Sequence, residues 1–365
     1  MPHTTKNHNT DQQVPCARCQ SSDAVLVVRT ENLCRECFVK YVATKILKRL
    51  EKNQIRGGFK ESQKTLLLPV SFGVSSISLL HVLDQQLQNR AQQGRYAGYN
   101  LHLLFVEQST VLEQVILESS IDLLKQRYPH TFTAISLEDY SSYGIEFEAL
   151  SGSKEENFQD MVSSLPSATS RADFIEIARR RLILEFAKKR RCDGILFGDS
   201  TTRLAEKTLS ETAKGRGVAV PWLTADGSSD GISCIYPMRD LLRKELTAYA
   251  SITTPPLTPL VLETATQIPT SSKDTTIDGL MSQYFESVEE GHPSIVANVV
   301  RTSGRLVAPS VSEDNQSCSI CGYPVFTGSW GGDQQSVISS QSTEGNGSRT
   351  GKVLCYGCTK TALKP

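Results

Sequence analysis

The sequence lacks an excess of charge of either sign, because 39 lysine and arginine residues balance 39 aspartate and glutamate residues among 365. A chain without a global electrostatic field can bind nucleic acid only through a local patch of cations. The sequence also has no apolar run that approaches the length needed to span a bilayer, and its first fourteen residues contain no apolar signal core. These absences exclude a membrane protein and lead us to expect a soluble intracellular one.

Aromatic residues are also few, at 7%, whereas ten cysteines are present. Eight of the ten fall in four CxxC pairs, and Cys192 and Cys234 stand alone. The paired residues are Cys16 and Cys19, Cys34 and Cys37, Cys318 and Cys321, and Cys355 and Cys358. In a chain that is expected inside the cell, CxxC pairs indicate metal ligands rather than disulfides.

Two CxxC turns bring four thiolates to one point, and Zn²⁺ prefers this tetrahedral arrangement. Fourteen residues separate the first two pairs, and thirty-three separate the last two. The longer insertion costs little, because loop-closure entropy grows slowly with length. A shell of four thiolates leaves no open coordination position, so we expect two structural zinc ions, one in each module. The alternative, reduced core cysteines, does not account for the paired spacing.

Between the two cysteine modules, short apolar runs alternate with segments of helical periodicity. The apolar runs predict buried strands at residues 65–71, 101–108, 131–140 and 194–200. Helices are expected at residues 34–50, 77–88, 112–127, 171–190, 277–290 and 294–302. This alternation predicts an α/β fold with a doubly wound, mostly parallel sheet. Ligands in such sheets bind at the carboxyl ends of the strands.

Four segments interrupt this alternation. Residues 89–100 form a polar insertion, residues 141–170 a long connection, and residues 253–274 a segment rich in proline and threonine that we expect on the surface. Residues 329–351 are too polar to bury a core and predict a flexible excursion. The expected organisation is a disordered tail (1–14), a zinc module with a helix (15–60), the α/β domain (61–252), a linker with helices (253–310) and a C-terminal zinc ribbon (311–365).

The stretch PVSFGVSS, Pro69–Ser76, connects the first expected strand to the helix that follows it. Glycine-rich turns at this position cradle phosphates, because glycine lets backbone N–H groups approach the phosphate oxygens. Here Phe72 adds a Cβ atom and a ring at the point of approach. Gly73, Ser75 and Ser76 could still offer donors to a phosphate at a helix N-terminus. The stretch is therefore either a decayed phosphate loop or an ordinary turn.

This stretch resembles the loop of the PP-loop ATP pyrophosphatase superfamily, of the adenine nucleotide alpha hydrolase-like type, which reads SGGxDS. Ser71, Gly73 and Ser76 match the motif, whereas Phe72 replaces the first glycine and Ser75 replaces the aspartate. The aspartate would bring a carboxylate to a site built around magnesium and phosphate. The resemblance implies a degenerate nucleotide loop and a doubtful ATP site.

A second segment supports the same resemblance. PP-loop tRNA thiolases carry a CxxC pair ahead of an Arg-Arg helix, and a GHNxDD segment after the next strand. Here Gly198 matches, but the His-Asn and Asp-Asp pairs do not, and Ala172 and Ile175 stand at the cysteine positions. Cys234 lies out of step with the family's further cysteine, and one thiol cannot hold an iron–sulfur cluster. The resemblance implies no catalytic residue and no such cluster in this chain.

The order of two zinc modules around an eroded PP-loop-like core resembles the cytoplasmic tRNA 2-thiolation protein 2 family. The stretches that carry this resemblance include CARC…CRECFVKY, FGDSTTRLAEKTL, YPMRDLLRKELTAY and CSICGYPV…LCYGC. The resemblance implies a non-catalytic cytoplasmic subunit that forms a heterodimer with the catalytic tRNA 2-thiolation protein 1 subunit. It further implies work on wobble uridine U34 of lysine, glutamine and glutamate tRNAs. The sulfur would come from the thiocarboxylated ubiquitin-related modifier, whose conjugation to proteins stays open as a second role.

Seven cations bracket the apolar side of the helix expected at 171–190. They are Arg179, Arg180, Arg181, Lys188, Lys189, Arg190 and Arg191. Clustered cations can hold tRNA phosphates without reading sequence. Such a cluster is equally typical of a solvated helix face with ordinary ion pairs, so both interpretations stay open.

Two other functions also stay open at this stage. One is an ATP-dependent adenylating enzyme with a divergent loop, against which the carboxylates missing after Gly198 argue. The other is a zinc-ribbon scaffold unrelated to tRNA. Zinc content does not separate these alternatives, because all of them keep the metal.

Overall fold

The computed structural model describes residues 14–53, 63–96, 98–107, 114–147, 150, 157–262, 275–310, 316–326, 337–338 and 352–362. The strands are β1 (Leu26–Val28), β2 (Glu31–Leu33), β3 (Lys64–Pro69), β4 (Tyr99–Glu107), β5 (Thr131–Ser136), β6 (Gly194–Leu196), β7 (Gly227–Ser229), β8 (Ile232–Ile235), β9 (Val337–Ile338) and β10 (Lys352–Val353). The α-helices are α1 (Arg35–Lys52), α2 (Val74–Gln92), α3 (Gln114–Arg127), α4 (Phe158–Ser164), α5 (Ala168–Lys189), α6 (Thr201–Ala213), α7 (Val220–Thr224), α8 (Arg243–Ile252), α9 (Ile277–Gly291), α10 (Pro293–Ser303) and α11 (Tyr356–Ala362). Three 3₁₀ helices complete the set: η1 (Leu137–Tyr143), η2 (Gly217–Ala219) and η3 (Thr258–Leu260).

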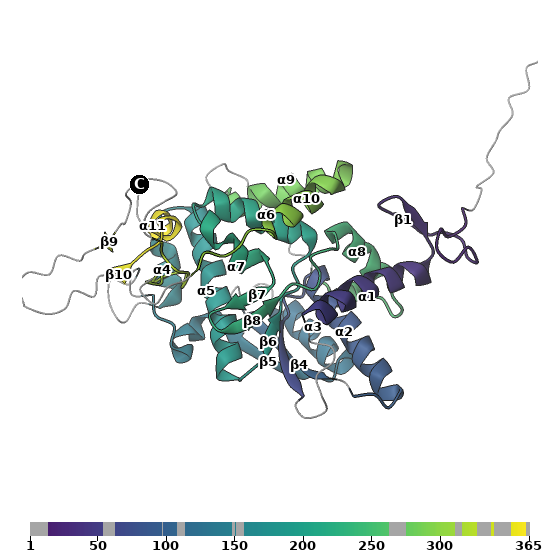
Figure 1. Cartoon of the computed structure of the whole chain (residues 1–365). Coiled ribbons are helices and arrows are strands. Elements are labelled where there is room, and N and C mark those ends of the chain that lie inside the picture. The colour runs from purple at the N-terminus through teal and green to yellow at the C-terminus, as the bar shows by residue number, and fades with distance from the viewer. Residues whose placement is uncertain are drawn as a thin grey trace, which may run out of the picture.

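A six-stranded sheet forms the centre of the molecule, with the strand order β5-β4-β3-β6-β8-β7. All neighbouring strands in it are parallel except β7, which pairs antiparallel with β8. Helices cover both faces of this sheet (Figure 1). The predicted doubly wound, mostly parallel α/β fold is therefore confirmed.

Strand β3 shows why the sheet is covered on both faces. Its residues Leu66 and Leu68 join one hydrophobic core, with side chains of α1, α2, α3 and α8. Leu67, which points the opposite way, joins a second core with side chains of α4, α5, α6, α9 and α10. Because side chains alternate along a strand, a run of consecutive leucines satisfies both cores at once.

Most expected elements are present, with shifted ends. Half of the segment expected as a polar insertion at 89–100 is regular structure, because α2 continues to Gln92 and β4 begins at Tyr99. The strand expected at 131–140 ends at Ser136, whose side chain accepts a hydrogen bond from the backbone N–H of Glu138 and so starts η1. The segment at 194–200 is a strand only to Leu196. Helix α6 and strands β7 and β8 were not expected from the sequence.

Several expectations concern segments that the structure does not describe. These are most of the N-terminal tail, the end of the segment rich in proline and threonine, and nearly all of the excursion at 329–351. Within the described part of the chain, η3 lies in the segment at 253–262, and α9 and α10 pack against α6. In that part no helix combines the length and hydropathy needed to cross a bilayer.

The two cysteine modules lie at opposite ends of the molecule (Figure 1). The N-terminal module sits at the start of α1, which packs against α2 and α8. Arg29 joins this module to the body, because its Nη2 donates to the backbone oxygen of Asp240 at 3.0 Å. The C-terminal module contributes α11, which packs against α5.

Gly198 fixes the distance between the end of β6 and the start of α2. A Cβ atom at this position would lie 2.9 Å from the Cα atom of Ser76 and 3.2 Å from its backbone nitrogen. Both neighbours are backbone atoms, which cannot turn away as a flexible side chain can. Glycine is therefore required for the close approach.

We expect Gly198→Ala to lower the free energy of unfolding by about 1–3 kcal/mol, the usual cost of overpacking. Urea denaturation followed by far-UV circular dichroism measures this difference. Gly227→Ala is the matched control, because a Cβ atom there meets open space. Its effect should stay within about 0.5 kcal/mol. Equal stabilities for the two variants would contradict the assigned packing.

Candidate functional site

The turn Ser71–Ser76 lies where β3 ends and α2 begins, at the carboxyl edge of the sheet. Its polar groups bond to one another. The backbone N–H of Ser71 donates to the Ser76 Oγ at 3.3 Å, and the backbone N–H of Gly73 donates to the Ser71 Oγ at 3.4 Å. The Ser76 Oγ in turn donates to the Gly73 backbone oxygen at 3.0 Å. These N–H groups are used inside the turn, whereas a working phosphate loop aims such groups at its ligand.

Phe72 occupies the centre of this turn. Its φ of +57° lies in the left-handed region that favours glycine, yet its side chain is fully buried. The ring packs edge-on against Phe105 with centroids 5.4 Å apart. Its backbone oxygen accepts a hydrogen bond from the N–H of Leu262 at 2.8 Å. The turn thus keeps a glycine-like backbone, while a core side chain and a later segment of the chain close it.

Charged groups that follow β6 lie at the same edge and pair among themselves. Asp199 Oδ2 lies 2.8 Å from the Lys207 Nζ, and Arg203 pairs with Glu206 at 3.0 Å. Burial favours the neutral acid, but Lys207 and Arg203 hold the pKa of the Asp199 carboxyl below its ordinary value. The carboxylate is therefore committed to these cations. Asp199 and Lys207 could not be recognised as a pair from the sequence, because they match no motif and lie eight positions apart.

The two cysteines outside the CxxC pairs are buried. Cys234, on β8, is 1% exposed, and Cys192, which precedes β6, is 5% exposed. Burial raises the pKa of both thiols, so each stays protonated and weakly nucleophilic. Ala172 and Ile175 lie in α5 and bring no thiol to the site. Every other cysteine in the described residues belongs to a group of four.

Cys16, Cys19, Cys34 and Cys37 form the first group, and their sulfur atoms all lie within 4.8 Å of one another. The sulfurs of Cys19 and Cys34 are 3.7 Å apart. Sulfurs in a tetrahedral zinc site lie roughly 3.8 Å apart, because each Zn–S bond is about 2.3 Å long. A hydrogen bond from the backbone N–H of Cys19 contributes most to lowering the pKa of Cys16 to about 6. The pKa of Cys37 is instead raised to about 12, mainly by a hydrogen bond with Cys34, so it is the sulfur geometry that suits a divalent cation.

Cys318, Cys321, Cys355 and Cys358 form the second group, also with all sulfurs within 4.8 Å. The sulfurs of Cys321 and Cys355 are 3.8 Å apart. The backbone N–H of Cys355 donates to the Cys318 sulfur at 3.4 Å, a contact that favours the thiolate. This module is more deeply buried than the first, since its cysteines form part of the second core. Both groups of four can hold a metal ion.

Two of the cations predicted to bind tRNA contact the C-terminal module instead. Arg181 Nη1 donates to the backbone oxygens of Ser319 and Ile320, both at 3.1 Å, between two metal-ligand positions. Arg180 donates to the hydroxyl of Tyr323 at 2.8 Å and to that of Tyr236 at 3.2 Å. These guanidiniums fasten the metal module onto α5. Their tRNA-binding role stays untested, but their donors already have partners within the chain.

The remaining cations of the cluster lie along α5 and at its end. Arg179 pairs with Glu176, and Lys188 pairs with Glu185 at 2.9 Å. Lys189, Arg190 and Arg191 are exposed. Since α5 runs back toward the amino end of β6, these three residues lie at the sheet edge opposite to the turn Ser71–Ser76. The sequence grouped seven cations that the structure divides between the middle of α5 and its C-terminal end.

Comparisons with known proteins agree with this geometry. A family model described as cytoplasmic tRNA 2-thiolation protein 2 matches residues 276–360. A protein of that name from Pyrenophora tritici-repentis is 44% identical, covering 96% of this chain and 95% of the relative. One from Phaeosphaeria nodorum is 42% identical, covering 95% of this chain and 94% of the relative.

Among solved structures, the U34-tRNA thiolase NcsA from Methanococcus maripaludis, determined with its [4Fe-4S] cluster, matches with a TM-score of 0.58. The match covers 85% of this chain and 92% of the thiolase at 15% identity. At this identity the likeness concerns the fold, and it agrees with a PP-loop-like core. The near full-length identity to the fungal relatives goes further: this chain belongs to the cytoplasmic tRNA 2-thiolation protein 2 family.

Proposed function

We propose that this chain is a non-catalytic subunit of the cytoplasmic complex that thiolates wobble uridine U34 at C2 in lysine, glutamine and glutamate tRNAs. The turn around Phe72 supports this proposal most directly, because the N–H groups of Ser71 and Gly73 donate within the turn and a buried phenylalanine stands where the motif has a glycine. The catalytic tRNA 2-thiolation protein 1 subunit would be its heterodimer partner. The thiocarboxylated ubiquitin-related modifier would deliver the sulfur.

The chemistry then belongs to the partner. ATP would adenylate the C2 oxygen of the uridine and release pyrophosphate, and a persulfide or thiocarboxylate sulfur would then attack C2 and displace AMP. A second thiol would break the remaining S–S bond, or water the remaining S–acyl bond, to leave the sulfur on C2. This chain supplies no carboxylate at Ser75 and no exposed thiol outside the groups of four, within its described residues. Its contribution is to brace the partner and to supply part of the tRNA surface. The α/β core of this chain would position the surfaces that contact the partner and the tRNA.

We propose zinc as the metal of both groups of four cysteines. When bound, zinc would cross-link each module and keep no position open for chemistry. The C-terminal ion would sit in a module held by Arg180 and Arg181, so it would order the surface beside α5 and α7. The N-terminal ion would fix the start of α1, because Cys34 is both a cysteine of the group and the N-cap of that helix.

For tRNA we propose a phosphate contact at Lys189, Arg190 and Arg191. Their exposure supports this role, whereas Arg180 and Arg181 are occupied by the C-terminal module. A purely local role is the competing interpretation, since cations at a helix C-terminus also interact favourably with its dipole. The adenylating enzyme and the zinc scaffold remain alternative functions, and the next two experiments separate them.

The isolated chain should release no AMP or pyrophosphate from ATP and magnesium. Neither Ser75→Asp nor Phe72→Gly should gain this activity. Ser75→Asp should fold normally, because a carboxylate is favourable in the first turn of a helix. Phe72→Gly should lose about 2–4 kcal/mol of stability, since the lost ring outweighs the relief of the positive φ. Thin-layer chromatography of labelled ATP gives the answer, and turnover by wild type or Ser75→Asp would support the adenylating enzyme.

In cells that lack this chain, thiolated lysine, glutamine and glutamate tRNAs should disappear. Thiolated tRNA is retarded in gels that contain an organomercury reagent, because mercury binds the thiocarbonyl group. The wild-type gene should restore the retarded bands, and Ser75→Asp should restore them equally well. Persistence of the bands without the chain would favour the zinc scaffold instead.

Wild-type protein should contain two zinc ions, and Arg181→Ala should release one of them about tenfold faster or more. The substitution removes charged hydrogen bonds to two backbone oxygens, each worth roughly 1.5–3 kcal/mol. Zinc release to 4-(2-pyridylazo)resorcinol, followed by absorbance, measures this rate. Arg190→Ala, on the same helix, is the control and should behave as wild type. Unchanged release from Arg181→Ala would show that these contacts do not hold the module closed.

A further inference from the structure

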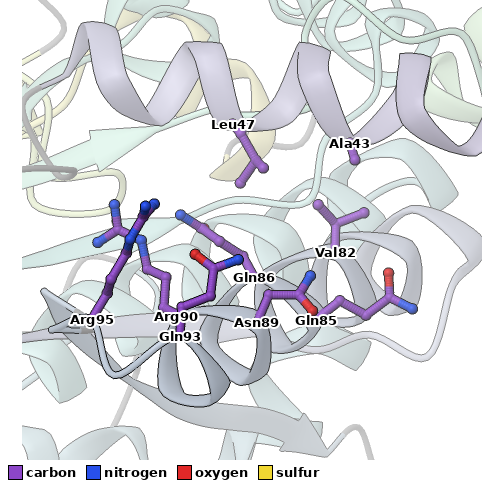
Figure 2. A pocket seen from close by; sticks show the side chains of 9 residues that line it. All are labelled: Ala43, Leu47, Val82, Gln85, Gln86, Asn89, Arg90, Gln93 and Arg95. Atoms are coloured by element: carbon purple, nitrogen blue, oxygen red, sulfur yellow. The ribbon is translucent and has the colours of Figure 1, made fainter.

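A groove between α1 and α2 lies apart from the closed turn and from both groups of four cysteines (Figure 2). Its volume is about 230 Å³. Ala43 and Leu47 of α1 and Val82 of α2 give it a small apolar floor. Since α2 runs from the carboxyl edge of the sheet to the amino edge, the groove continues toward the end opposite to the turn Ser71–Ser76. Nothing in the proposed function uses it.

The rest of the lining is polar and carries no acidic side chain. Four amides line it, from Gln85, Gln86, Asn89 and Gln93. Two guanidiniums, of Arg90 and Arg95, lie at one end (Figure 2). Amides both donate and accept, whereas guanidiniums only donate and are always charged. A complementary ligand therefore carries a negative charge at one end and a mixed donor and acceptor edge at the other.

Gln86 gives independent support for a ligand. Its side chain is 6% exposed, and its Oε1 accepts a hydrogen bond from the hydroxyl of Tyr99 at 2.8 Å, which fixes the amide orientation. Its Nε2 is buried and has no hydrogen-bond partner in the described part of the chain. Figure 2 shows this nitrogen extending toward the arginine end of the groove. Buried donors are normally satisfied, so an acceptor is expected here.

The two arginines at this end of the groove differ: Arg90 is held by a hydrogen bond within the chain, whereas Arg95 is exposed. Arg90 Nη1 donates to the backbone oxygen of Tyr96 at 3.0 Å, which holds its guanidinium in place. Arg95 is exposed. Exposed lysines of α1, Lys48 and Lys52, follow Leu47 along the same helix. The local charge is therefore positive on both helices, although the whole chain is neutral.

We propose that this groove binds one unpaired nucleotide of RNA. The phosphate lies at Arg90 and Arg95, the base lies over the apolar floor, and the amides bond to its edge. Glutamine and asparagine amides suit base edges, and unpaired bases are the parts of RNA that proteins read. An acidic peptide fits less well, because three small apolar side chains offer it little anchoring surface. The inference rests on the proposed function in that tRNA would be the RNA that supplies the nucleotide.

The test uses the full zinc-loaded chain and fluorescence anisotropy with a labelled single-stranded RNA heptamer. Ala43→Trp fills the floor without a change of charge, and Arg95→Glu reverses the charge at the phosphate end. Each should weaken binding about tenfold or more, and Arg95→Glu should also reduce the salt slope by about 1. Arg301→Glu, at an exposed position of α10, makes the same charge change elsewhere and should cost less than about twofold. Thermal unfolding checks that all three variants are folded.

Equal losses from Arg95→Glu and Arg301→Glu, or no loss from folded Ala43→Trp, would overturn the proposal. A labelled hexaglutamate peptide that binds wild type and is lost in Ala43→Trp, while RNA binding is unchanged, would identify a peptide groove instead. The organomercury gel keeps the two claims separate. If thiolation requires the chain but the groove variants bind RNA normally, only the groove proposal fails. If the variants lose RNA while thiolation persists without the chain, only the proposed function fails.

Discussion

The position of β3 is the constraint on which the rest of the structure depends. It pairs with β4 on one side and β6 on the other, and its leucines belong to both hydrophobic cores. Because β3 is hydrogen-bonded along both edges and packed on both faces, its position is fixed. The turn that follows it therefore meets the end of β6 at a fixed place. The backbones meet so closely there that a Cβ atom at Gly198 would collide with the backbone of Ser76. Packing therefore fixes the geometry of this edge of the sheet.

Charged side chains at this edge contact one another or the C-terminal module. Asp199 and Lys207 satisfy each other, and Arg180 and Arg181 hold the C-terminal module. In water such contacts contribute little, but here they are half-buried, and those of Arg180 and Arg181 join segments far apart in the sequence. Arg180 and Arg181 thus connect α5 to the C-terminal cysteine module. The N-terminal module is joined separately, through α1 and Arg29.

The sequence was informative where a pattern is local. Paired cysteine spacing predicted both groups of four, and apolar runs such as Leu66–Leu68 predicted the parallel sheet. It failed where tertiary contacts decide. Arg180 and Lys189 cannot be told apart within a run of cations. Only the packing of the C-terminal module against α5 shows that Arg180 contacts this module, whereas Lys189 is exposed. The groove was missed because its polar end, from Asn89 to Arg95, was assigned to an insertion, whereas α2 continues to Gln92 and brings Asn89 and Arg90 to the groove beside α1.

Phe72 also limits how this protein can change. Its ring is part of the core, so replacing it with glycine would make the chain less stable. Ser75 could become aspartate at little cost, but the carboxylate would face a turn that is still filled. An active loop would need several substitutions at once, each of no use without the others. The filled turn is therefore maintained by the requirements of folding, independently of any selection on chemistry.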